Sequence, residues 1–329
     1  TQSRSSAASD VYKRQGKGRK RSLHHLAGGR TGWHGRSTHR AGGSPRRLHR
    51  SQHRQVDAAS HARALRPLRT RAFSNAEGTN QVAPHPPNVV ELEGDFNHRM
   101  LHTRGTRLHV AEAGNRGDPL ILLIHGAFGG WFDFKDAIAP LAAHGLHVAA
   151  LDARGFGMSD KPPHRAGDTL QILSGDVEGV IRTLGHTRAA VVGADTGSVI
   201  AKAAAKRHNE LIHQVISLPT SSGFPAALTR LPAPLLSLSE RALDSIWRAN
   251  FVAETSDAFH ASQDFQEHLA LRLAARRIDN ALSHIVAASR LRPFTAQDSD
   301  LDGPIAQLAL PHVEDPTAFV MAVVKLLDL

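Results

Sequence analysis

The segment around Asp195 constrains the fold of this chain more than any other. An apolar run of Ala and Val ends at Gly193, and an alanine-rich, helix-favouring segment continues to Lys206. This pattern predicts a strand, a tight turn and a helix, with Asp195 at the tip of the turn. Gly193 and Gly197 stand two residues before and after that tip, where small residues let a helix fold back closely against a strand.

A carboxylate at the tip of such a turn has two interpretations. Asp is a favoured helix N-cap, so Asp195 can serve simply to cap the helix that follows. Alternatively, the turn presents Asp195 as a nucleophile, which attacks carbon and forms an alkyl ester with the enzyme. A short motif does not decide between the two, and the context upstream does.

The positive charge of the chain is concentrated in residues 1–88. This tail has 18 Lys and Arg against 3 Asp and Glu, whereas the remaining residues have 22 against 27. Because the tail is rich in Arg, His, Gly and Ser and poor in apolar residues, we expect it to be disordered. The excess of basic residues therefore does not predict specific nucleic-acid binding by the folded part, and tail-driven binding of polyanions is a remote alternative.

Composition also limits cofactors and location. No apolar stretch approaches the roughly 20 residues needed to cross a bilayer, which predicts a soluble protein without a membrane span. The absence of Cys excludes disulfides and thiolate chemistry. We expect no metal and no cofactor, a small-molecule substrate as partner, and a cytoplasmic location, although an Arg- and Ser-rich, acid-poor tail is also typical of a transit peptide.

Apolar runs of strand length alternate with helical patterns after the tail. We expect a β-hairpin from residues 96–102 and 107–111, strands at 119–124, 147–151, 188–193 and 214–218, and helices at 133–144, 169–184 and after Asp195. This alternation predicts an α/β fold with an open, mostly parallel sheet and helices on both faces. His125, Asp152 and Asp195 each follow a strand, where the reactive groups of such sheets gather.

Three motifs occur in order along this part of the chain. They are His125-Gly126, Asp152-Ala-Arg-Gly-Phe-Gly-Met-Ser-Asp-Lys-Pro-Pro163 and Gly193-Ala-Asp195-Thr-Gly197. With them, residues 96–218 resemble the N-terminal core of the α/β-hydrolase superfamily, in its branch of epoxide hydrolases and dehalogenases. The resemblance implies that Asp195 is a nucleophile, and that a His-activated water hydrolyses the resulting ester.

The resemblance also implies roles around the nucleophile. Backbone N–H groups of Thr196 and of Ala127 or Phe128 would stabilise the developing oxyanion. His125 is expected to support its turn rather than to transfer protons. Trp131 either lines the substrate pocket beside Asp195 or packs beneath the loop.

The second motif contributes two residues to which we assign structural roles. We expect Asp152 to stabilise its turn and Arg154 to form a salt bridge, rather than either residue acting in catalysis.

Residues 219–291 are Pro-rich and then helical, with amphipathic segments at 235–252 and 264–277, and they resemble the helical cap of the family. Residues 89–218 and 292–329 then form the two parts of the core. Trp247, Phe251 and Phe259 of the cap either line the pocket or, as is commoner for such residues, pack in the core.

In the family, two further strands follow the cap, one with the acid at its end and one followed by the catalytic His. The C-terminal part of this chain is short of both. Residues 305–310 are the candidate last strand. Asp300, one of three neighbouring carboxylates, is the candidate acid. His312 is either the base or a second, non-catalytic His, since Ala309 stands where the catalytic His of many relatives is found.

The substrate bond is not resolved by the sequence. The single Tyr is Tyr12 in the tail, which disfavours epoxide opening by the Tyr hydroxyls that the family uses. Thr196 follows the nucleophile where many relatives have Trp, and no Arg stands beside Asp195 as it does in haloacetate dehalogenases. The alternative to a working hydrolase is a catalytically compromised relative that acts as a ligand-binding scaffold.

Overall fold

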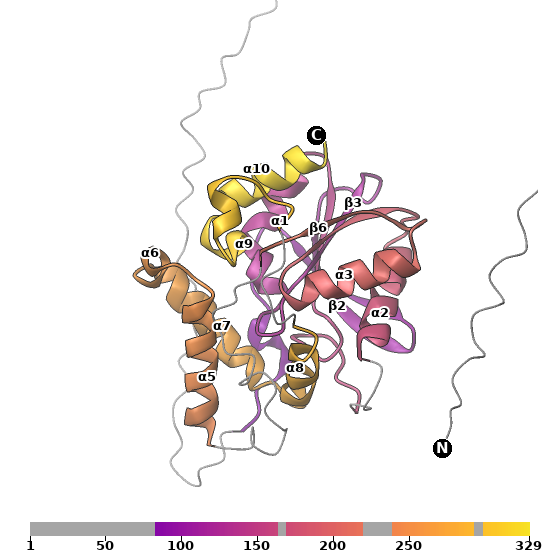
Figure 1. The fold of residues 1–329 in the computed structure, drawn as a ribbon. Coiled ribbons are helices and arrows are strands. Elements are labelled where there is room, and N and C mark those ends of the chain that lie inside the picture. Colours follow the sequence, from indigo (N-terminus) through magenta and orange to yellow (C-terminus); the bar gives the residue numbers. More distant parts are fainter. Residues whose placement is uncertain (1–82, 164–168, 220–238, 293–298) are drawn as a thin grey trace, which may run out of the picture. The chain divides into compact units, whose positions relative to one another are not determined.

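A computed structural model describes residues 83–163, 169–219, 239–292 and 299–329 (Figure 1). Contacts divide the chain into two units at Asn75 and Ala76, and all the described residues belong to the second. The basic tail is predicted to be disordered, and its residues 1–82 lie outside the described residues.

The described residues form one six-stranded sheet in the order β1-β2-β4-β3-β5-β6. Strands β3 to β6 are parallel, whereas the β1–β2 hairpin is antiparallel and joins β4 through β2. The predicted mostly parallel sheet is thus confirmed. Its strands are β1 (Asn97–Thr103), β2 (Thr106–Ala113), β3 (Leu120–Ile124), β4 (His147–Leu151), β5 (Ala189–Gly193) and β6 (Ile212–Ser217).

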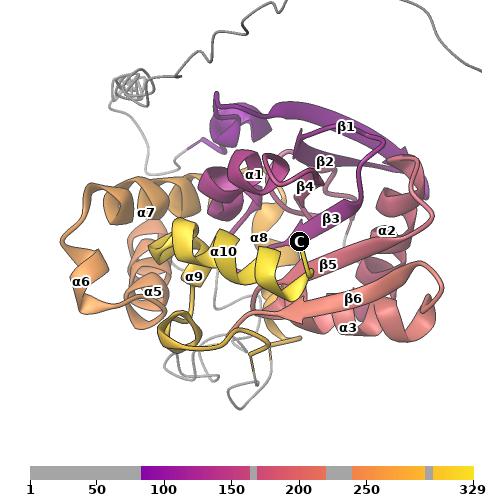
Figure 2. The same cartoon turned by 90° about the horizontal axis from the view of Figure 1, so that it is seen from above.

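Helices cover both faces of this sheet (Figure 2). On one face α2 (Thr169–Thr183) packs beside α3 (Thr196–Arg207), and on the other α1 (Lys135–Ala142) packs beside α10 (Pro316–Leu326). Every residue of β3, β4 and β5 is buried, because each of these central strands has helices on both sides. In the part of the chain that the structure describes, no helix combines the length and apolarity that a membrane crossing needs.

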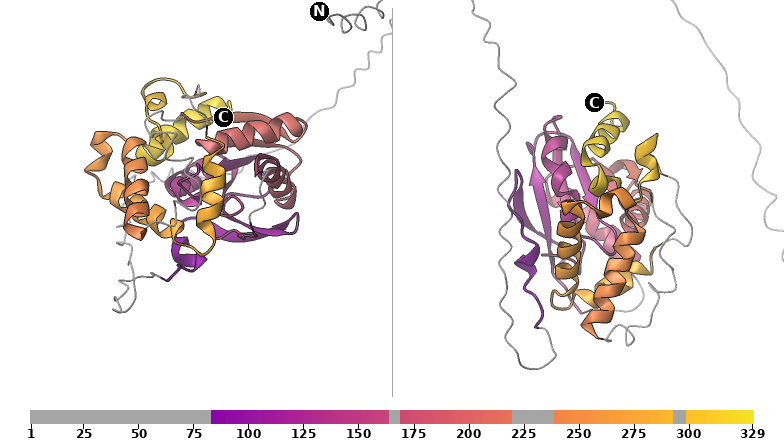
Figure 3. Two further views of the ribbon diagram at one scale, coloured as in Figure 1. Left: turned by 60° about the horizontal axis from the view of Figure 1, so that its bottom comes forward. Right: turned by 90° about the vertical axis from the view of Figure 1, so that its left-hand side faces the viewer.

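Within residues 239–292, the described part of the segment expected to form the cap, the chain forms four helices: α5 (Glu240–Ala253), α6 (Asp257–His260), α7 (Gln263–Arg276) and α8 (Ala281–Ser289). We call this segment the cap region. Ser239, Ser256 and Ser262 begin the first three, since each hydroxyl accepts a hydrogen bond from a backbone N–H of the first turn. Helices α5 and α7 lie side by side (Figure 3), and the Phe251 and Phe265 rings stack between them at 4.8 Å.

The C-terminal part differs from the sequence prediction, and a last strand at residues 305–310 is wrong. The chain instead forms a 3-10 helix, η4 (Pro304–Gln307), and a short helix, α9 (Pro311–Glu314), before α10. Pro304 and Pro311 favour this outcome because each occupies the first turn of a helix, where its missing N–H costs no hydrogen bond. The segment touches the sheet at Asp300, whose N–H donates to Ser217 O at 3.0 Å.

The folded part also begins before residue 89, the boundary expected from composition. His85 N–H donates to Arg277 O at 2.8 Å, and Asp279 N–H donates to His85 O at 3.4 Å. A 3-10 helix, η1 (Pro87–Val90), then buries Val90 completely. The proline-rich sequence does not indicate that this segment packs against the folded part, since prolines favour extended chain whether or not it packs.

We therefore expect two tail deletions to differ. Removal of residues 1–82 should leave the thermal midpoint unchanged. Removal of residues 1–88 also eliminates the two His85 backbone hydrogen bonds, each worth about 1 kcal/mol, and should lower the midpoint by about 6 °C. Differential scanning calorimetry of the two proteins tests this, and equal midpoints would show that the His85 contact contributes nothing.

Candidate active site

The turn between β5 and α3 holds Asp195 in a strained backbone conformation. Its φ of 49° and ψ of −118° lie in a region that residues other than glycine rarely adopt. Hydrogen bonds fix the conformation on both sides: Ala194 N–H donates to Ile124 O at 2.9 Å, and Gly197 N–H donates to Ala194 O at 2.7 Å. Strand β3 therefore sets the position of the turn.

Glycine is required beside Asp195 because the backbones approach too closely for a side chain. A Cβ at Gly193 would lie 2.5 Å from the carbonyl carbon of Gly197, and one at Gly197 would lie 2.3 Å from Ile124 O. A Cβ at Gly126 would lie 2.9 Å from that of Asp195. The predicted tight strand–turn–helix is confirmed.

The Asp195 carboxylate does not cap α3, so the helix-cap interpretation is wrong. Instead, Oδ2 accepts a hydrogen bond from Ala127 N–H at 3.3 Å, in the loop after β3. Oδ1 has no aligned hydrogen-bond donor among the described residues. The carboxylate is buried, and its Oδ2 is hydrogen-bonded to the loop after β3 rather than to its own helix.

Arg292, at the end of the cap region, forms an ion pair with the nucleophile candidate. Its Nε lies 3.0 Å from Asp195 Oδ1, and both side chains are 92% buried. Its Nη2 donates to Glu254 Oε1. The sequence places no Arg beside Asp195, but the fold brings one there from 97 positions further along the chain.

The ion pair belongs to a larger buried charge cluster. Arg272 on α7 lies with Nη1 3.7 Å from Glu254 Oε2 and with Nη2 3.0 Å from Asp133 Oδ2. All five side chains are at least 92% buried. The cluster, which comprises three carboxylates and two guanidinium groups, consists of Asp195, Arg292, Glu254, Arg272 and Asp133.

Burial and mutual attraction set the charges of the cluster. Burial acts to lower the pKa of Arg292, but the carboxylates of Glu254 and Asp195 outweigh it and raise that pKa. Burial raises the pKa of Glu254, and the nearby negative charge of Asp195 adds to the effect. Arg292 is therefore a permanent cation, and Glu254 is a carboxyl group that binds a proton more readily than usual.

His312, the predicted base, lies in an apolar environment on α9. Its ring stacks on Phe134 at 4.4 Å and is 99% buried. Neither ring nitrogen has a hydrogen-bond partner, and no hydrogen bond or ion pair joins it to Asp195 within the described stretches. Burial lowers the pKa of His312 to about 3, against the attraction of Asp133. Such an imidazole is neutral but a weak base.

Asp300, the predicted acid, is engaged by the sheet. Its Oδ2 accepts a hydrogen bond from Ser217 N–H at 2.6 Å, at the carboxyl end of β6. The two unpartnered nitrogens of His312 show that Asp300 does not orient that ring in this structure. The structure thus does not join Asp195, His312 and Asp300 into a hydrogen-bonded triad.

The predicted oxyanion residues have different environments. Ala127 supplies an N–H to Asp195, and Thr196 begins α3 directly after it, where a helix has N–H groups free of intrahelical partners. Phe128 packs edge-on against Trp247 at 5.0 Å, where the loop after β3 meets α5. Phe251 and Phe259 pack together in a second apolar cluster with Phe265, Leu269, Leu310 and Val313.

Trp131 lies in the core. Its indole is fully buried, its Nε1 donates to Val90 O at 3.1 Å, and its ring packs edge-on against Phe96 and His98. Of its two predicted roles, this placement corresponds to packing beneath the loop.

His125, Asp152 and Arg154, from the first two sequence motifs, support the loops around Asp195. His125 Nε2 accepts from Ala153 N–H at 3.2 Å, so that its Nδ1–H donates to Gly126 O at 2.7 Å. Asp152 accepts hydrogen bonds from the backbone of Trp131 and Met158 and from His109. Arg154 forms a bidentate salt bridge with Asp176, with both distances 2.7 Å. Their predicted structural roles agree with these contacts.

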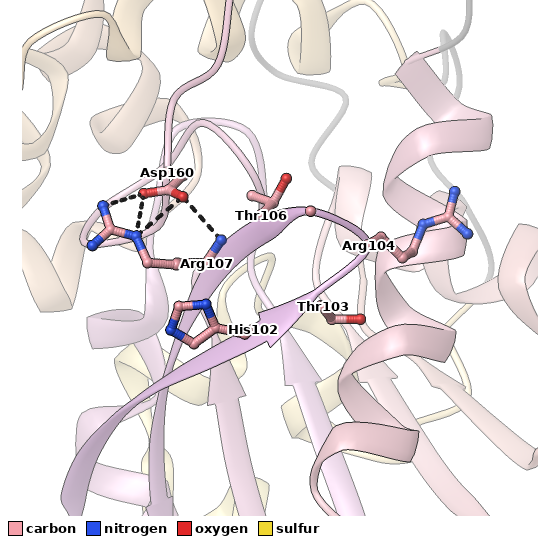
Figure 4. A pocket seen from close by; sticks show the side chains of 7 residues that line it. His102, Thr103, Arg104, Thr106, Arg107 and Asp160 are labelled. Carbon is pink, nitrogen blue, oxygen red and sulfur yellow. Dashed lines mark hydrogen bonds and ion pairs between the residues drawn. The ribbon is translucent and has the colours of Figure 1, made fainter.

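A separate, shallow pocket of about 270 Å³ lies at the β1–β2 turn (Figure 4). Its cations are already neutralised, because Arg107 is paired with Asp160 and Arg104 approaches Asp176 at 3.7 Å. It shares no residue with the buried charge cluster. Within the described ranges, no group of three or more His, Asp or Glu is arranged to hold a metal ion.

Sequence reasoning missed Arg292, Glu254 and Arg272. For Arg272 a signal existed, since it stands on the apolar face of α7 at helical spacing from Phe265 and Leu269. A charged residue on a face that must be buried requires a buried partner. Nothing in the sequence around Arg292 indicates that it meets Asp195.

Comparison with known proteins agrees with this architecture. The family model described as alpha/beta hydrolase fold matches residues 119–301, more than half of the chain. Epoxide hydrolase 4 of Mus musculus is 35% identical over 137 residues, which cover 41% of this chain and 38% of that protein. Epoxide hydrolase B of Mycobacterium tuberculosis is 37% identical over 123 residues, or 37% of this chain and 35% of that protein. The chain thus spans less than half the length of these curated relatives.

A solved structure of the epoxide hydrolase CorEH without ligand superposes with a TM-score of 0.51 and 23% identity. The match covers 60% of this chain and 74% of CorEH. Epoxide hydrolase VrEH1 from Vigna radiata gives the same TM-score at 19% identity, over 60% of this chain and 72% of VrEH1. At such identities the likeness shows the fold alone.

The close approach at Gly193 yields a stability prediction. Gly193→Ala should lower the free energy of unfolding by about 3 kcal/mol, because its Cβ meets the backbone of the turn. Gly117→Ala is the matched control, since a Cβ there meets nothing within 4 Å, and it should change stability by less than about 0.5 kcal/mol. Urea denaturation measures both, and equal effects would contradict the tight turn.

The burial of His312 yields a pH prediction. Its folded-state pKa of about 3 lies below the ordinary 6.5, so the unfolded chain takes up the proton first as the pH falls. The associated stability is complete above pH 6.5 and is lost progressively down to about pH 3. At pH 5 this loss amounts to about 2 kcal/mol.

His312→Leu should abolish this part of the acid destabilisation. Urea denaturation of both proteins at pH 7.5 and pH 5 measures it, and a loss that persists unchanged in the variant would show that His312 protonates normally in the folded state.

Proposed function

This chain belongs to the alpha/beta hydrolase fold family, and on that premise we propose that it uses Asp195 as a nucleophile toward a small, largely apolar electrophile. The names of its relatives point to epoxides as the substrate class. Asp195 then forms a covalent alkyl ester, which water hydrolyses. The proposal requires no cofactor.

The single observation that carries the proposal is the geometry of the Asp195 carboxylate. The strained turn directs the carboxylate away from α3, and Ala127 N–H donates to Oδ2 at 3.3 Å. Oδ1 lies 3.0 Å from Arg292 Nε, and no described residue gives it an aligned hydrogen bond. A carboxylate that serves only to cap a helix needs none of this strain. The same Ala127 N–H stands ready to stabilise the oxyanion when water attacks the ester.

The proposed first step is a ring opening. A lone pair of Asp195 Oδ1 forms a bond to one epoxide carbon, the carbon–oxygen bond of the ring breaks, and the electron pair stays on the ring oxygen. That oxygen takes a proton from water. In the second step water attacks the ester carbonyl and releases the diol, so the new carboxylate oxygen comes from water.

The position of His312 favours a second candidate function. A buried imidazole with a pKa of about 3 and no contact with Asp195 is poorly suited to activate water. We therefore infer that the ester breaks down slowly, so that the protein traps its ligand as an adduct. A scaffold that only binds ligand without bonding to it is the limiting case.

Styrene oxide in heavy-oxygen water tests these alternatives. We expect a mass increase of one probe molecule on Asp195, located by peptide mass spectrometry and absent in Asp195→Asn. Rapid diol release with heavy oxygen in Asp195 would instead show full turnover and contradict the trap. If neither adduct nor diol forms, Asp195 is not a nucleophile and the proposal is overturned.

A further inference from the structure

One hydrogen-bond donor of Arg292 has no acceptor among the described residues. Its Nε faces Asp195 and its Nη2 donates to Glu254, whereas its buried Nη1 has no hydrogen-bond partner in the described ranges. Leaving a buried charged donor unsatisfied costs free energy, about 1–3 kcal/mol or more. The side chain of Arg292 is 92% buried and lies beside the proposed nucleophile. Its unused donor therefore indicates that an atom of a bound ligand accepts the hydrogen bond.

Epoxide opening needs a donor of this kind. When the ring opens, negative charge develops on the leaving oxygen, and a donor aimed at that position stabilises the transition state. A Tyr hydroxyl is one suitable donor, but the only Tyr of the chain is Tyr12, outside the described residues. Among the described residues, Arg292 is a permanent cation that directly contacts Asp195.

We propose that Arg292 is a catalytic residue whose Nη1–H binds the epoxide oxygen and stabilises it as the ring opens. This inference rests on the proposed function, since it assigns the leaving-group donor of the same site. It also commits the site to electrophiles whose leaving atom is a hydrogen-bond-accepting oxygen.

The charge balance of the cluster supports this role. In the free protein Arg292 neutralises the carboxylate of Asp195. Formation of the ester removes that negative charge and creates one on the ring oxygen. If Arg292 contacts both positions, the total charge around it stays constant through the step, and no unpaired cation is left buried.

Proton transfer is separate from this stabilisation. The pKa of Arg292 is raised above that of an ordinary guanidinium, so Arg292 does not give up its proton. The ring oxygen, once freed, takes a proton from water, and hydroxide leaves to the buffer. Arg292 therefore acts through its charge and its hydrogen bond.

The test compares two probes that differ in their leaving group. Ring opening of styrene oxide produces an alkoxide, which needs a donor to stabilise it. Alkylation by 1-iodobutane releases iodide, which is a stable anion without such a donor. Alkylation rates of Asp195 are measured for each probe by intact-protein mass spectrometry. In Arg292→Gln we expect the rate with styrene oxide to fall by about 100-fold or more, while the rate with 1-iodobutane stays within about threefold.

Controls separate charge from fold. Arg290→Gln makes the same substitution at an exposed position two residues away and should react as the unchanged protein does. Arg292→Lys keeps the charge and should recover part of the styrene oxide rate. If Arg292→Gln alone fails to fold, the double variant with Glu254→Gln removes both charges of the pair and gives the same comparison.

Other outcomes overturn the inference. An equal fall with both probes shows that Arg292 only positions Asp195, and an unchanged rate with both shows that it plays no part. A loss confined to carboxylate-bearing epoxides shows that Arg292 binds a substrate anion instead. If the unchanged protein gives neither an adduct nor a hydrolysis product with either probe, the proposed function itself is refuted, which distinguishes the two failures.

Discussion

The backbone of Asp195 is the constraint on which the site depends. A φ of 49° at a non-glycine residue is unfavourable by about 1–3 kcal/mol, and it persists only where the surroundings leave no alternative. Here β3 and β5 are paired along their full length, and Ile124 O fixes the residue before the turn. The stability of the central sheet thus offsets the unfavourable free energy of the strained turn.

The buried charge cluster imposes a second constraint. Five charged side chains taken out of water carry a large desolvation cost, which is compensated only when each has partners. Arg272 satisfies this requirement by reaching Glu254 on one side and Asp133 on the other, with its guanidinium over the Phe251 ring at 4.4 Å. Removal of one member would leave a buried charge uncompensated, so the cluster behaves as a unit.

The sequence was sufficient for the elements whose pattern is local. The hairpin, the central strands and the turn at Asp195 follow from apolar periodicity and from glycine placement, and the structure confirms them. The structure contradicts a strand at residues 305–310, because two prolines favour helical turns and Asp300 already occupies the end of β6.

The contacts of Arg292 had no local signal. The ion pair with Asp195 joins residues almost a hundred positions apart, and it depends on how the segment after α8 meets the turn between β5 and α3. The same reason limited the prediction for His312, whose residue type fits a base but whose surroundings, Phe134 and Phe319, do not. The sequence identifies His312 as a residue type that can act as a base, but it does not show that the fold buries its ring among aromatic side chains.

The bond between Arg272 and Asp133 has a mechanical consequence. Arg272 belongs to α7, and Asp133 belongs to η2 (Trp131–Phe134), which continues the loop that carries Ala127. The ion pair therefore links α7 to the loop whose Ala127 N–H donates to the Asp195 carboxylate. If Asp195 is the nucleophile that we propose, a ligand that displaces α7 would also displace the donor that orients the nucleophile.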